Sequence, residues 1–452
     1  MATILTLDAL IAHYNLNTKS RKQDREERGE VFTPLDIVNL FLDKVAAEYT
    51  RDHGSNIYEN PHLTWFEPSA GKGHFVVQIY ARLMSGLAQV ILDEEERRRW
   101  IVQRMLYMSE LGDENVQTLR TVLCGNRYTL NIHHGDTLEM PVSTKYDVVI
   151  GNPPYNSGGM IAQRHSTTHG RGTYKALHMP FITRSVVDWC KPEGYVALIV
   201  PTRWMAKPDH PMRHTQIRWV EIWNNQFTKT RIEALLPLTL FVLRNTPNTE
   251  KMETHLCYYH DTFTTESRMY LDPSELIPLA HSPALMKLQR FIKRHGIEVK
   301  MKHSPPSIRG LVKRPMSTVD DPFDGTWAAA GYCIKRGVLV VQTPTPTRCA
   351  GDRKIIIPSS RMFQGAFTDN GRMGVSGPYY ITNVDNTDIL LKVLGFRIMA
   401  AVTVATHYNM QLMHAGTTSP FIPDLGKLGI TDITEEAFYD LIGLTEEERA
   451  SL

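Results

Sequence analysis

Cysteine and long apolar runs are both scarce in this chain of 452 residues. Its five cysteines are scattered and never form a CxxC pair, which argues against a disulfide framework and against a zinc site. No stretch approaches the ~18 apolar residues that a membrane helix needs, and the first residues lack the basic and apolar regions of a secretory signal. We therefore expect a soluble, cytoplasmic protein that has no membrane partner.

Net charge is also small, at +2, and the hydrophobic share of 42% is that of an ordinary globular protein. The charge is unevenly distributed along the chain, however. Residues 281–373 carry 16 Lys or Arg and 6 Asp or Glu, a net charge of +10, whereas residues 374–452 carry 4 and 10, a net charge of −6. This asymmetry predicts one positive face that suits a polyanion, although a solvated Lys-rich surface explains the charge equally well.

Apolar periodicity predicts an α/β protein. A helical period covers residues 35–48, with Thr33 as the expected N-cap and Pro34 in the first turn. Beyond it, short apolar runs at residues 63–66, 104–110, 128–136, 146–151 and 194–201 alternate with helical periods. Such alternation is typical of βαβ units in a parallel, doubly wound sheet. A polar connector at residues 245–255 predicts a boundary between a domain at 1–248 and an α+β domain at 249–452.

Two segments at expected strand ends have features of a ligand site. Residues 67–75 (EPSAGKGHF) lead from a strand into a helix, where exposed backbone amides and glycines allow close approach of a ligand, although an ordinary tight turn fits as well. Glu110 ends the next strand, where a carboxylate can accept both hydroxyls of a ribose. Asp136 ends the third strand and offers an acceptor for an exocyclic amine. His133 and His134 point to opposite faces of that strand, so we expect no metal site there.

The most specific motif is Asn152-Pro153-Pro154-Tyr155, which follows the apolar strand YDVVIG. The two prolines stiffen the backbone and hold the Asn152 side-chain oxygen and the Pro153 carbonyl in fixed directions. Two such acceptors can bind one NH2 group, and Tyr155 offers an aromatic face for a flat base. The alternative is a proline turn that caps the strand, with Tyr155 packed in the core.

The order of these motifs resembles that of the gamma-type N6-adenine DNA methyltransferases, which use S-adenosyl-L-methionine. Residues 29–34 (GEVFTP) match the GExFTP-like opening segment of that family, and residues 194–201 (GYVALIVP) match its G-x-V-x-x-I-x-P strand. Between these two segments lie, in the family's order, the glycine loop within residues 67–75, Glu110, Asp136 and the NPPY motif. The resemblance covers about residues 25–245 and implies a Rossmann-like methyltransferase sheet followed by a C-terminal α+β target recognition domain.

The resemblance also implies roles for individual residues. It assigns cofactor contacts to Thr33, Glu67, Gly71, Gly73, Phe75, Glu110 and Asp136. Asn152 and the Pro153 carbonyl are then expected to bind the amine of an adenine flipped out of double-stranded DNA, while Tyr155 stacks on the base. Phe227 is our choice for a second aromatic on the other face of the base, and a core position is its alternative.

The expected DNA surface lies in the C-terminal half. Its candidate contacts are Arg309, Lys313, Arg314, Lys335 and Arg336. NPPY is shared with enzymes that methylate RNA adenine or protein glutamine, and a catalytically idle DNA-binding subunit of a restriction-modification assembly is a further alternative. The resemblance leaves room for a separately encoded restriction nuclease as a partner, and it favours a bacterial or viral origin.

Overall fold

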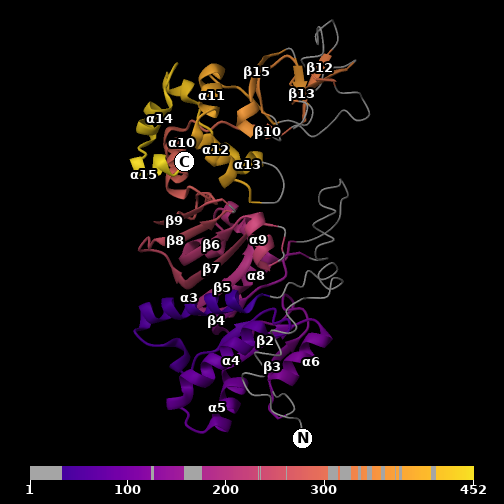
Figure 1. Ribbon diagram of the computed structural model, residues 1–452, viewed down its shortest axis with the longest axis vertical. Coiled ribbons are helices and arrows are strands. Elements are labelled where there is room, and N and C mark those ends of the chain that lie inside the picture. Colours follow the sequence, from indigo (N-terminus) through magenta and orange to yellow (C-terminus); the bar gives the residue numbers. More distant parts are fainter. Residues whose placement is uncertain are drawn as a thin grey trace. The chain divides into compact units, whose positions relative to one another are not determined.

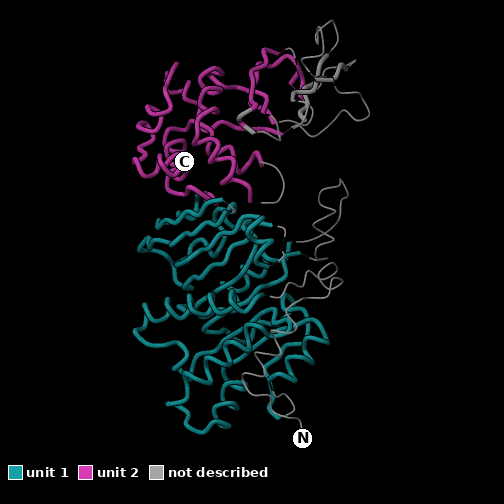
Figure 2. Tube along the Cα trace, in the orientation of Figure 1, with its two compact units in different colours: residues 1–275 teal, residues 276–452 magenta. Residues whose placement is uncertain are grey.

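The computed structural model describes residues 33–123, 127–156, 176–232, 234, 236–260, 262–303, 314–315, 327–333, 337–343, 349–357, 362–371, 373–375, 379–408 and 414–452. The chain divides into two compact units, residues 1–275 and 276–452 (Figure 2). No helix in these described ranges is long and apolar enough to cross a membrane.

Unit 1 is built on one sheet of nine described strands in the order β3-β2-β1-β4-β5-β7-β6-β8-β9 (Figure 1). The strands are β1 (Trp65–Glu67), β2 (Leu106–Glu110), β3 (Asn131–His134), β4 (Tyr146–Gly151), β5 (Cys190–Pro201), β6 (Thr215–Trp223), β7 (Leu238–Pro247), β8 (Thr254–Tyr259) and β9 (Thr264–Met269). Strands β3, β2, β1, β4 and β5 pair in parallel, whereas β7 lies antiparallel between β5 and β6. The predicted α/β sheet is therefore confirmed.

Helices cover both faces of this sheet because its central strands are apolar on both sides. The helices of unit 1 are α3 (Leu35–His53), α4 (His74–Gly86), α5 (Glu94–Trp100), α6 (Asp113–Val122), α8 (His178–Arg184) and α9 (Asn225–Ile232). On β1, Trp65 belongs to the core formed with α3 and α4. Phe66 points to the other face, where its ring meets Trp189, just beyond α8, at a centroid distance of 5.5 Å.

The start of α3 differs from the prediction by one residue. Pro34 occupies the N-cap position, and no side chain caps the helix. The hydroxyl of Thr33 is used elsewhere, because it accepts a hydrogen bond from the Asn152 side chain at 3.1 Å. A tertiary contact has thus taken the place of the local cap that the sequence predicted.

The division between the units comes after Glu275 and not near residue 248. Strands β8 and β9 follow the polar connector but still belong to the sheet of unit 1, since β8 pairs in parallel with β6 and β9 pairs with β8. The connector between β7 and β8 is therefore a loop within one unit.

Unit 2 combines two small sheets with helices. The sheets have the strand orders β10-β17-β14-β15 and β11-β13-β12-β16 among the described residues. Their strands are β10 (Met301–His303), β11 (Arg314–Pro315), β12 (Trp327–Cys333), β13 (Gly337–Thr343), β14 (Arg353–Ile357), β15 (Phe367–Asn370), β16 (Met373–Val375) and β17 (Tyr379–Thr382). The helices are α10 (Ser282–His295), α11 (Thr387–Leu394), α12 (Arg397–Ala405), α13 (Ala415–Thr418), α14 (Glu435–Ile442) and α15 (Glu446–Ala450). This composition fits the α+β class that the sequence predicts.

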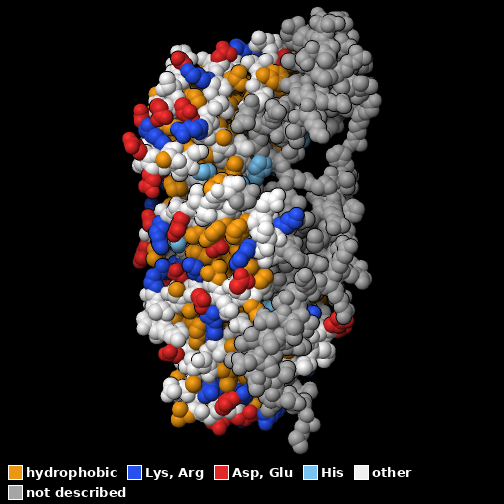
Figure 3. Space-filling model, viewed as in Figure 1, with side chains coloured by type: hydrophobic (Ala, Val, Ile, Leu, Met, Phe, Trp, Pro, Cys, Tyr) orange, Lys and Arg blue, Asp and Glu red, His pale blue; other side chains and the backbone are white. Residues whose placement is uncertain are grey.

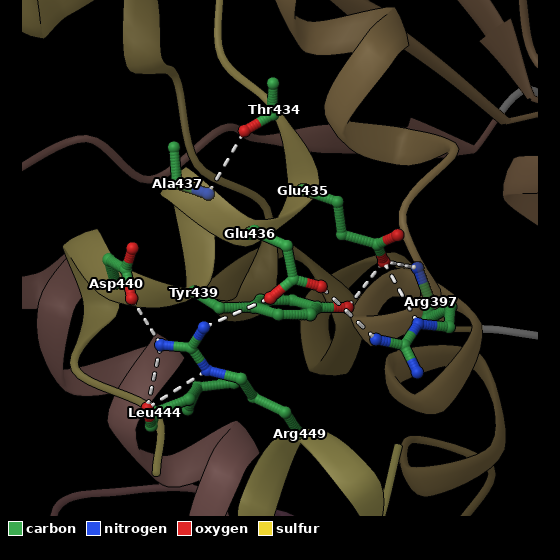
Figure 4. A network of polar contacts seen from close by, with 9 residues as sticks. All are labelled: Arg397, Thr434, Glu435, Glu436, Ala437, Tyr439, Asp440, Leu444 and Arg449. Carbon is green, nitrogen blue, oxygen red and sulfur yellow. Dashed lines mark hydrogen bonds and ion pairs between the residues drawn. The ribbon is translucent and has the colours of Figure 1, made fainter. Parts of the chain in front are cut away.

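The negative charge of residues 374–452, the acidic C-terminal segment, is partly neutralised by ion pairs within unit 2. Arg449 forms ion pairs with Glu436 and Asp440, and Arg397 pairs with Glu435 at 3.6 Å (Figure 4). Figure 3 shows acidic and basic side chains intermixed over α14 and α15. These exposed pairs each contribute little stability, but they remove isolated negative charge from this part of the surface.

One lysine of the basic block, residues 281–373, has a structural role inside unit 2. Lys354 on β14 is fully buried, and its ammonium group lies 2.6 Å from Asp369 on β15. Asp369 also accepts hydrogen bonds from the backbone amides of Gly371 and Met373. Lys354 is therefore not available for phosphate contacts, and the surface charge of the block is smaller than the sequence count.

Candidate active site at the carboxyl edge of the sheet

The predicted site residues come together because parallel strands end at one edge of a sheet. Strands β1, β2 and β4 run side by side in parallel. β6 has the same direction, because both β5 and β6 are antiparallel to β7. The glycine loop (residues 68–73), Glu110, the NPPY segment (residues 152–155) and Phe227 all follow the carboxyl ends of these strands.

The glycine loop is tied to the end of β2 by Glu110. The Gly71 amide donates to Glu110 Oε2 at 2.7 Å, and the Gly112 amide donates to Glu110 Oε1 at 2.7 Å. Gly73 begins α4 with a φ of 90°, in the left-handed region that glycine adopts without steric cost. The predicted positions Gly71, Gly73 and Glu110 therefore lie together, and Glu110 fixes the path of the loop.

Glu67 is a buried carboxyl at the end of β1, with 3% of its surface exposed. Burial raises its pKa well above the usual range; a hydrogen bond from the Val76 amide opposes this shift, and the charge of Glu110 adds to it. Its Oε2 atom has no hydrogen-bond partner among the described residues. Because a buried polar atom without a partner is costly, Glu67 is suited to a cationic or hydrogen-bond-donating ligand.

Glu67 also adjoins the NPPY segment. A Cβ atom built on Gly151 would lie 3.3 Å from Glu67 Cγ, so a larger residue would press on the carboxyl side chain. Gly151 directly precedes Asn152. The end of β1 and the end of β4 thus form one continuous site.

Asn152 is held by hydrogen bonds on both sides of its amide. Its Nδ2 donates to Thr33 Oγ1 at 3.1 Å, and its Oδ1 accepts from the Tyr155 hydroxyl at 2.8 Å. Burial raises the pKa of Tyr155, an effect that the bond to Asn152 opposes, so the phenol remains a neutral donor. Thr33, predicted as a cofactor contact, here orients the Asn152 side chain.

The remaining predicted residues differ in their surroundings. Phe227 is half-buried at the start of α9, and its ring stacks on Tyr259 with a centroid distance of 5.1 Å. Phe75 is buried in the core, where it packs against Phe41 at 6.3 Å. Asp136 is exposed, and its Oδ1 accepts from the Leu138 amide at 2.9 Å.

Thr137 is a site residue that the sequence analysis missed. Its buried hydroxyl donates to the Pro68 carbonyl of the glycine loop at 2.7 Å and lies 2.7 Å from the Ser109 hydroxyl on β2. It therefore connects three strand ends. The only sequence signal was its position directly after Asp136.

Several predicted residues cannot be placed. Arg309, Lys313, Lys335 and Arg336 lie outside the described residues, as does the 29–32 part of the GExFTP-like segment. Arg314 belongs to β11, but the description does not extend to its side chain.

Comparison with known proteins agrees with this geometry. Residues 106–224, which include β2, β4 and the NPPY segment, match the family model described as Eco57I restriction-modification methylase. An uncharacterized adenine-specific methylase of Mycoplasma pneumoniae is 25% identical over a match that covers 41% of this chain and 58% of that protein. The Type II methyltransferase M.PaeR7I of Pseudomonas aeruginosa is 28% identical over 40% of this chain and 33% of its own length. The predicted resemblance is confirmed.

These curated relatives are matched over part of their length only. The chain spans a little over half of the first and about a third of the second. Among solved structures, the Type IIL restriction-modification enzyme MmeI, determined in complex with DNA, aligns with a TM-score of 0.52 at 12% identity. The alignment covers 88% of this chain and 69% of MmeI, so the similarity in fold extends beyond unit 1.

Proposed function

We propose that this protein is a sequence-specific DNA methyltransferase that transfers a methyl group from S-adenosyl-L-methionine to N6 of adenine. The observation that carries the proposal is the fixed position of Asn152 Oδ1 in an NPPY segment at the end of β4, directly after Gly151, which lies against the buried Glu67. An acceptor fixed at this position can bind an amine and direct its lone pair, which is the main task of an N-methyltransferase site.

The residues present fit the cofactor. S-adenosyl-L-methionine supplies a methyl group activated by a positively charged sulfonium, and its methionine part carries an ammonium group. The buried Glu67, whose Oε2 lacks a partner among the described residues, offers an acceptor for such a ligand, and a positive charge beside it favours the ionised carboxylate that burial alone disfavours. Glu110 suits the ribose hydroxyls, because its Oε2 atom accepts one hydrogen bond, from Gly71, and can accept another.

Binding of the target amine requires a change at Tyr155. In the free protein the Tyr155 hydroxyl occupies Asn152 Oδ1, one of the two acceptors proposed for the amine. The entering amine replaces one hydrogen bond by another, and the released ring becomes free to stack on the base. Thr33 holds the Asn152 side chain in place from the other side, because its hydroxyl oxygen accepts a hydrogen bond from Nδ2.

Phe227 is proposed as the second aromatic neighbour of the base. Its edge contact with Trp223 and its stack on Tyr259 hold the ring in a fixed orientation at the carboxyl edge. Asp136 and Phe75 are proposed cofactor contacts with less structural support, since Phe75 is a core residue and Asp136 is exposed.

Methyl transfer from radiolabelled S-adenosyl-L-methionine tests this proposal. The full chain is incubated with mixed-sequence duplex DNA, and the product is digested to nucleosides and analysed by mass. N6-methyladenine is the expected product. Label in RNA or in a protein glutamine instead of DNA supports the corresponding alternative, and absence of cofactor binding supports an idle subunit.

The DNA surface is proposed to lie in the basic part of unit 2, around Lys313, Arg314, Lys335 and Arg336. Each phosphate contact that is lost lowers the slope of log affinity against log salt by about 0.9. Neutralising the four side chains together is therefore expected to weaken DNA binding and to flatten its salt dependence. An unchanged slope places the DNA surface elsewhere. A separately encoded nuclease stays a prediction, which co-purification from the source cell tests.

A further inference from the structure

The β8–β9 hairpin gathers three different metal-ligand side chains, although the cysteine spacing gave no sign of a metal site. His255 and Cys257 lie on β8, and Glu266 lies on β9. One potential ligand atom from each side chain lies within 4.8 Å of those of the other two. No other group of this kind occurs among the described residues.

The strand register explains why these side chains share one face. Residues two apart on a strand point to the same side, which places His255 and Cys257 together. Cys257 is directly opposite Glu266 in the antiparallel ladder, and His255 is its diagonal neighbour. The convergence is therefore a property of the hairpin backbone and does not depend on one side-chain rotamer alone.

We propose that His255, Cys257 and Glu266 form a zinc site that joins β8 to β9. Zinc prefers nitrogen, thiolate and carboxylate ligands in a tetrahedral arrangement. With bonds of ~2.0 Å to nitrogen and ~2.3 Å to sulfur, tetrahedral geometry places the two ligand atoms ~3.5 Å apart. The observed separation of His255 Nε2 and Cys257 Sγ is 3.4 Å. Glu266 already contacts His255 Nε2, so a small rotation of its carboxylate admits the ion.

Two carboxylate residues are paired with Cys257 in the sheet. Glu266 contacts His255 Nε2, and the Cys257 sulfur lies 3.4 Å from the same nitrogen, so all three side chains converge on one point. Glu266 is the partner of Cys257 in the β8–β9 register. Glu221 is the partner of Cys257 in the β6–β8 register. A bound dication stabilises the Cys257 thiolate, and the thiol proton is released to solvent.

The position of the site suggests a structural role. β9 is the last strand in the described order of the sheet, and its residues alternate between exposed and half-buried. A metal link therefore secures β9, a strand with no buried residue, to the buried strand β8. The link also acts next to the proposed base site, since Tyr259, two residues after Cys257, stacks on Phe227. Because Glu266 is exposed, the fourth coordination position is left to water, and in this the site differs from closed zinc sites with four protein ligands.

Metal titration of the full chain tests the proposal. The reduced protein is stripped with a chelator and titrated with Zn²⁺ by calorimetry, and with Co²⁺ by visible absorption. We expect one equivalent of Zn²⁺ to bind, and we expect a Co²⁺ spectrum with thiolate charge-transfer and tetrahedral bands. Cys257→Ser is expected to remove the charge-transfer band and to weaken Zn²⁺ binding at least tenfold.

Two further variants keep the test decisive. Cys190→Ser changes another buried free cysteine, on β5, and is expected to leave both titrations unchanged. Glu266→Gln alters an exposed side chain, so it reports on the site even if Cys257→Ser fails to fold; it is expected to weaken Zn²⁺ binding. The proposal is overturned if the stripped protein binds no equivalent of Zn²⁺, or if binding and spectrum are the same in Cys257→Ser or Glu266→Gln as in the natural chain.

Discussion

The buried carboxyl of Glu67 allows a sharp test of cofactor binding. Glu67→Gln keeps the shape of the side chain and its hydrogen-bond acceptor but removes the negative charge. Burial raises the pKa of Glu67, and the uncharged glutamine places no charge at this buried position. The substitution is therefore expected to leave the fold intact and to act mainly on the bound state.

The expected loss of affinity follows from the lost charged contact. A hydrogen bond to a charged partner contributes about 1.5–3 kcal/mol, and each 1.4 kcal/mol is a factor of ten in Kd. The affinity for S-adenosyl-L-methionine should fall about 10- to 100-fold.

Glu67→Gln is also expected to change how the stability of the fold depends on pH. A carboxyl whose folded pKa is raised favours folding most below its ordinary pKa of 4.5, and this contribution is lost as the pH rises above that value. Glu67→Gln removes that loss and flattens the stability profile above pH 4.5.

Calorimetric titration with the cofactor, together with thermal unfolding at several pH values, measures both effects. Glu221→Gln is the matched control, because Glu221 is also a buried carboxyl with a raised pKa but lies on β6, where it accepts from the Trp223 indole. Its affinity for the cofactor should equal that of the natural chain. If Glu67→Gln binds the cofactor as tightly as the Glu221→Gln control, Glu67 does not contact the cofactor's charged groups and the reasoning fails.

Three further substitutions test the contacts around the site. In Glu110→Gln one carbonyl oxygen stands where two carboxylate oxygens now accept from the Gly71 and Gly112 amides, so one amide loses its partner. We expect the free energy of unfolding, measured by heat or denaturant, to fall by about 1–3 kcal/mol. Unchanged stability argues against this contact. Thr137→Val leaves the Pro68 carbonyl without its hydrogen-bond donor, so the Tm should fall by several degrees and cofactor binding should weaken. An unaltered Tm would show that this hydrogen bond does not form. Tyr155→Phe removes the hydrogen bond to Asn152 but keeps the ring, so the rate of methyl transfer should stay within about tenfold of normal. Tyr155→Ala removes the ring and should abolish methyl transfer. Equal activity of the two variants contradicts stacking on the base.

The sheet of unit 1 was predictable because its signals are local. The apolar runs that became β2, β4 and β5 and the helical periods of α3 and α6 depend only on neighbouring residues in the chain. The NPPY segment was predictable for a similar reason, since two prolines restrict the backbone whatever surrounds them.

The parts that sequence reasoning missed depend on distant residues. Strands β8 and β9 join the sheet of unit 1 because β8 pairs with β6, a contact that no local pattern announces. Thr33 has the signature of a helix cap, but Asn152 supplies a partner from far along the chain. The zinc ligands proposed on β8 and β9 meet only through the hairpin register, so their spacing in sequence resembles no metal motif.

The central claim is that Asn152 binds the target amine, and Asn152→Ala tests it most directly. Methyl transfer to duplex DNA and cofactor affinity are measured side by side, with Asn156→Ala as a control for a nearby asparagine on the same segment. We predict that Asn152→Ala binds S-adenosyl-L-methionine within about threefold of the natural chain but loses methyl transfer by at least about 100-fold, as expected for removal of a fixed polar group that acts in the transition state. Near-normal turnover by Asn152→Ala would contradict the account.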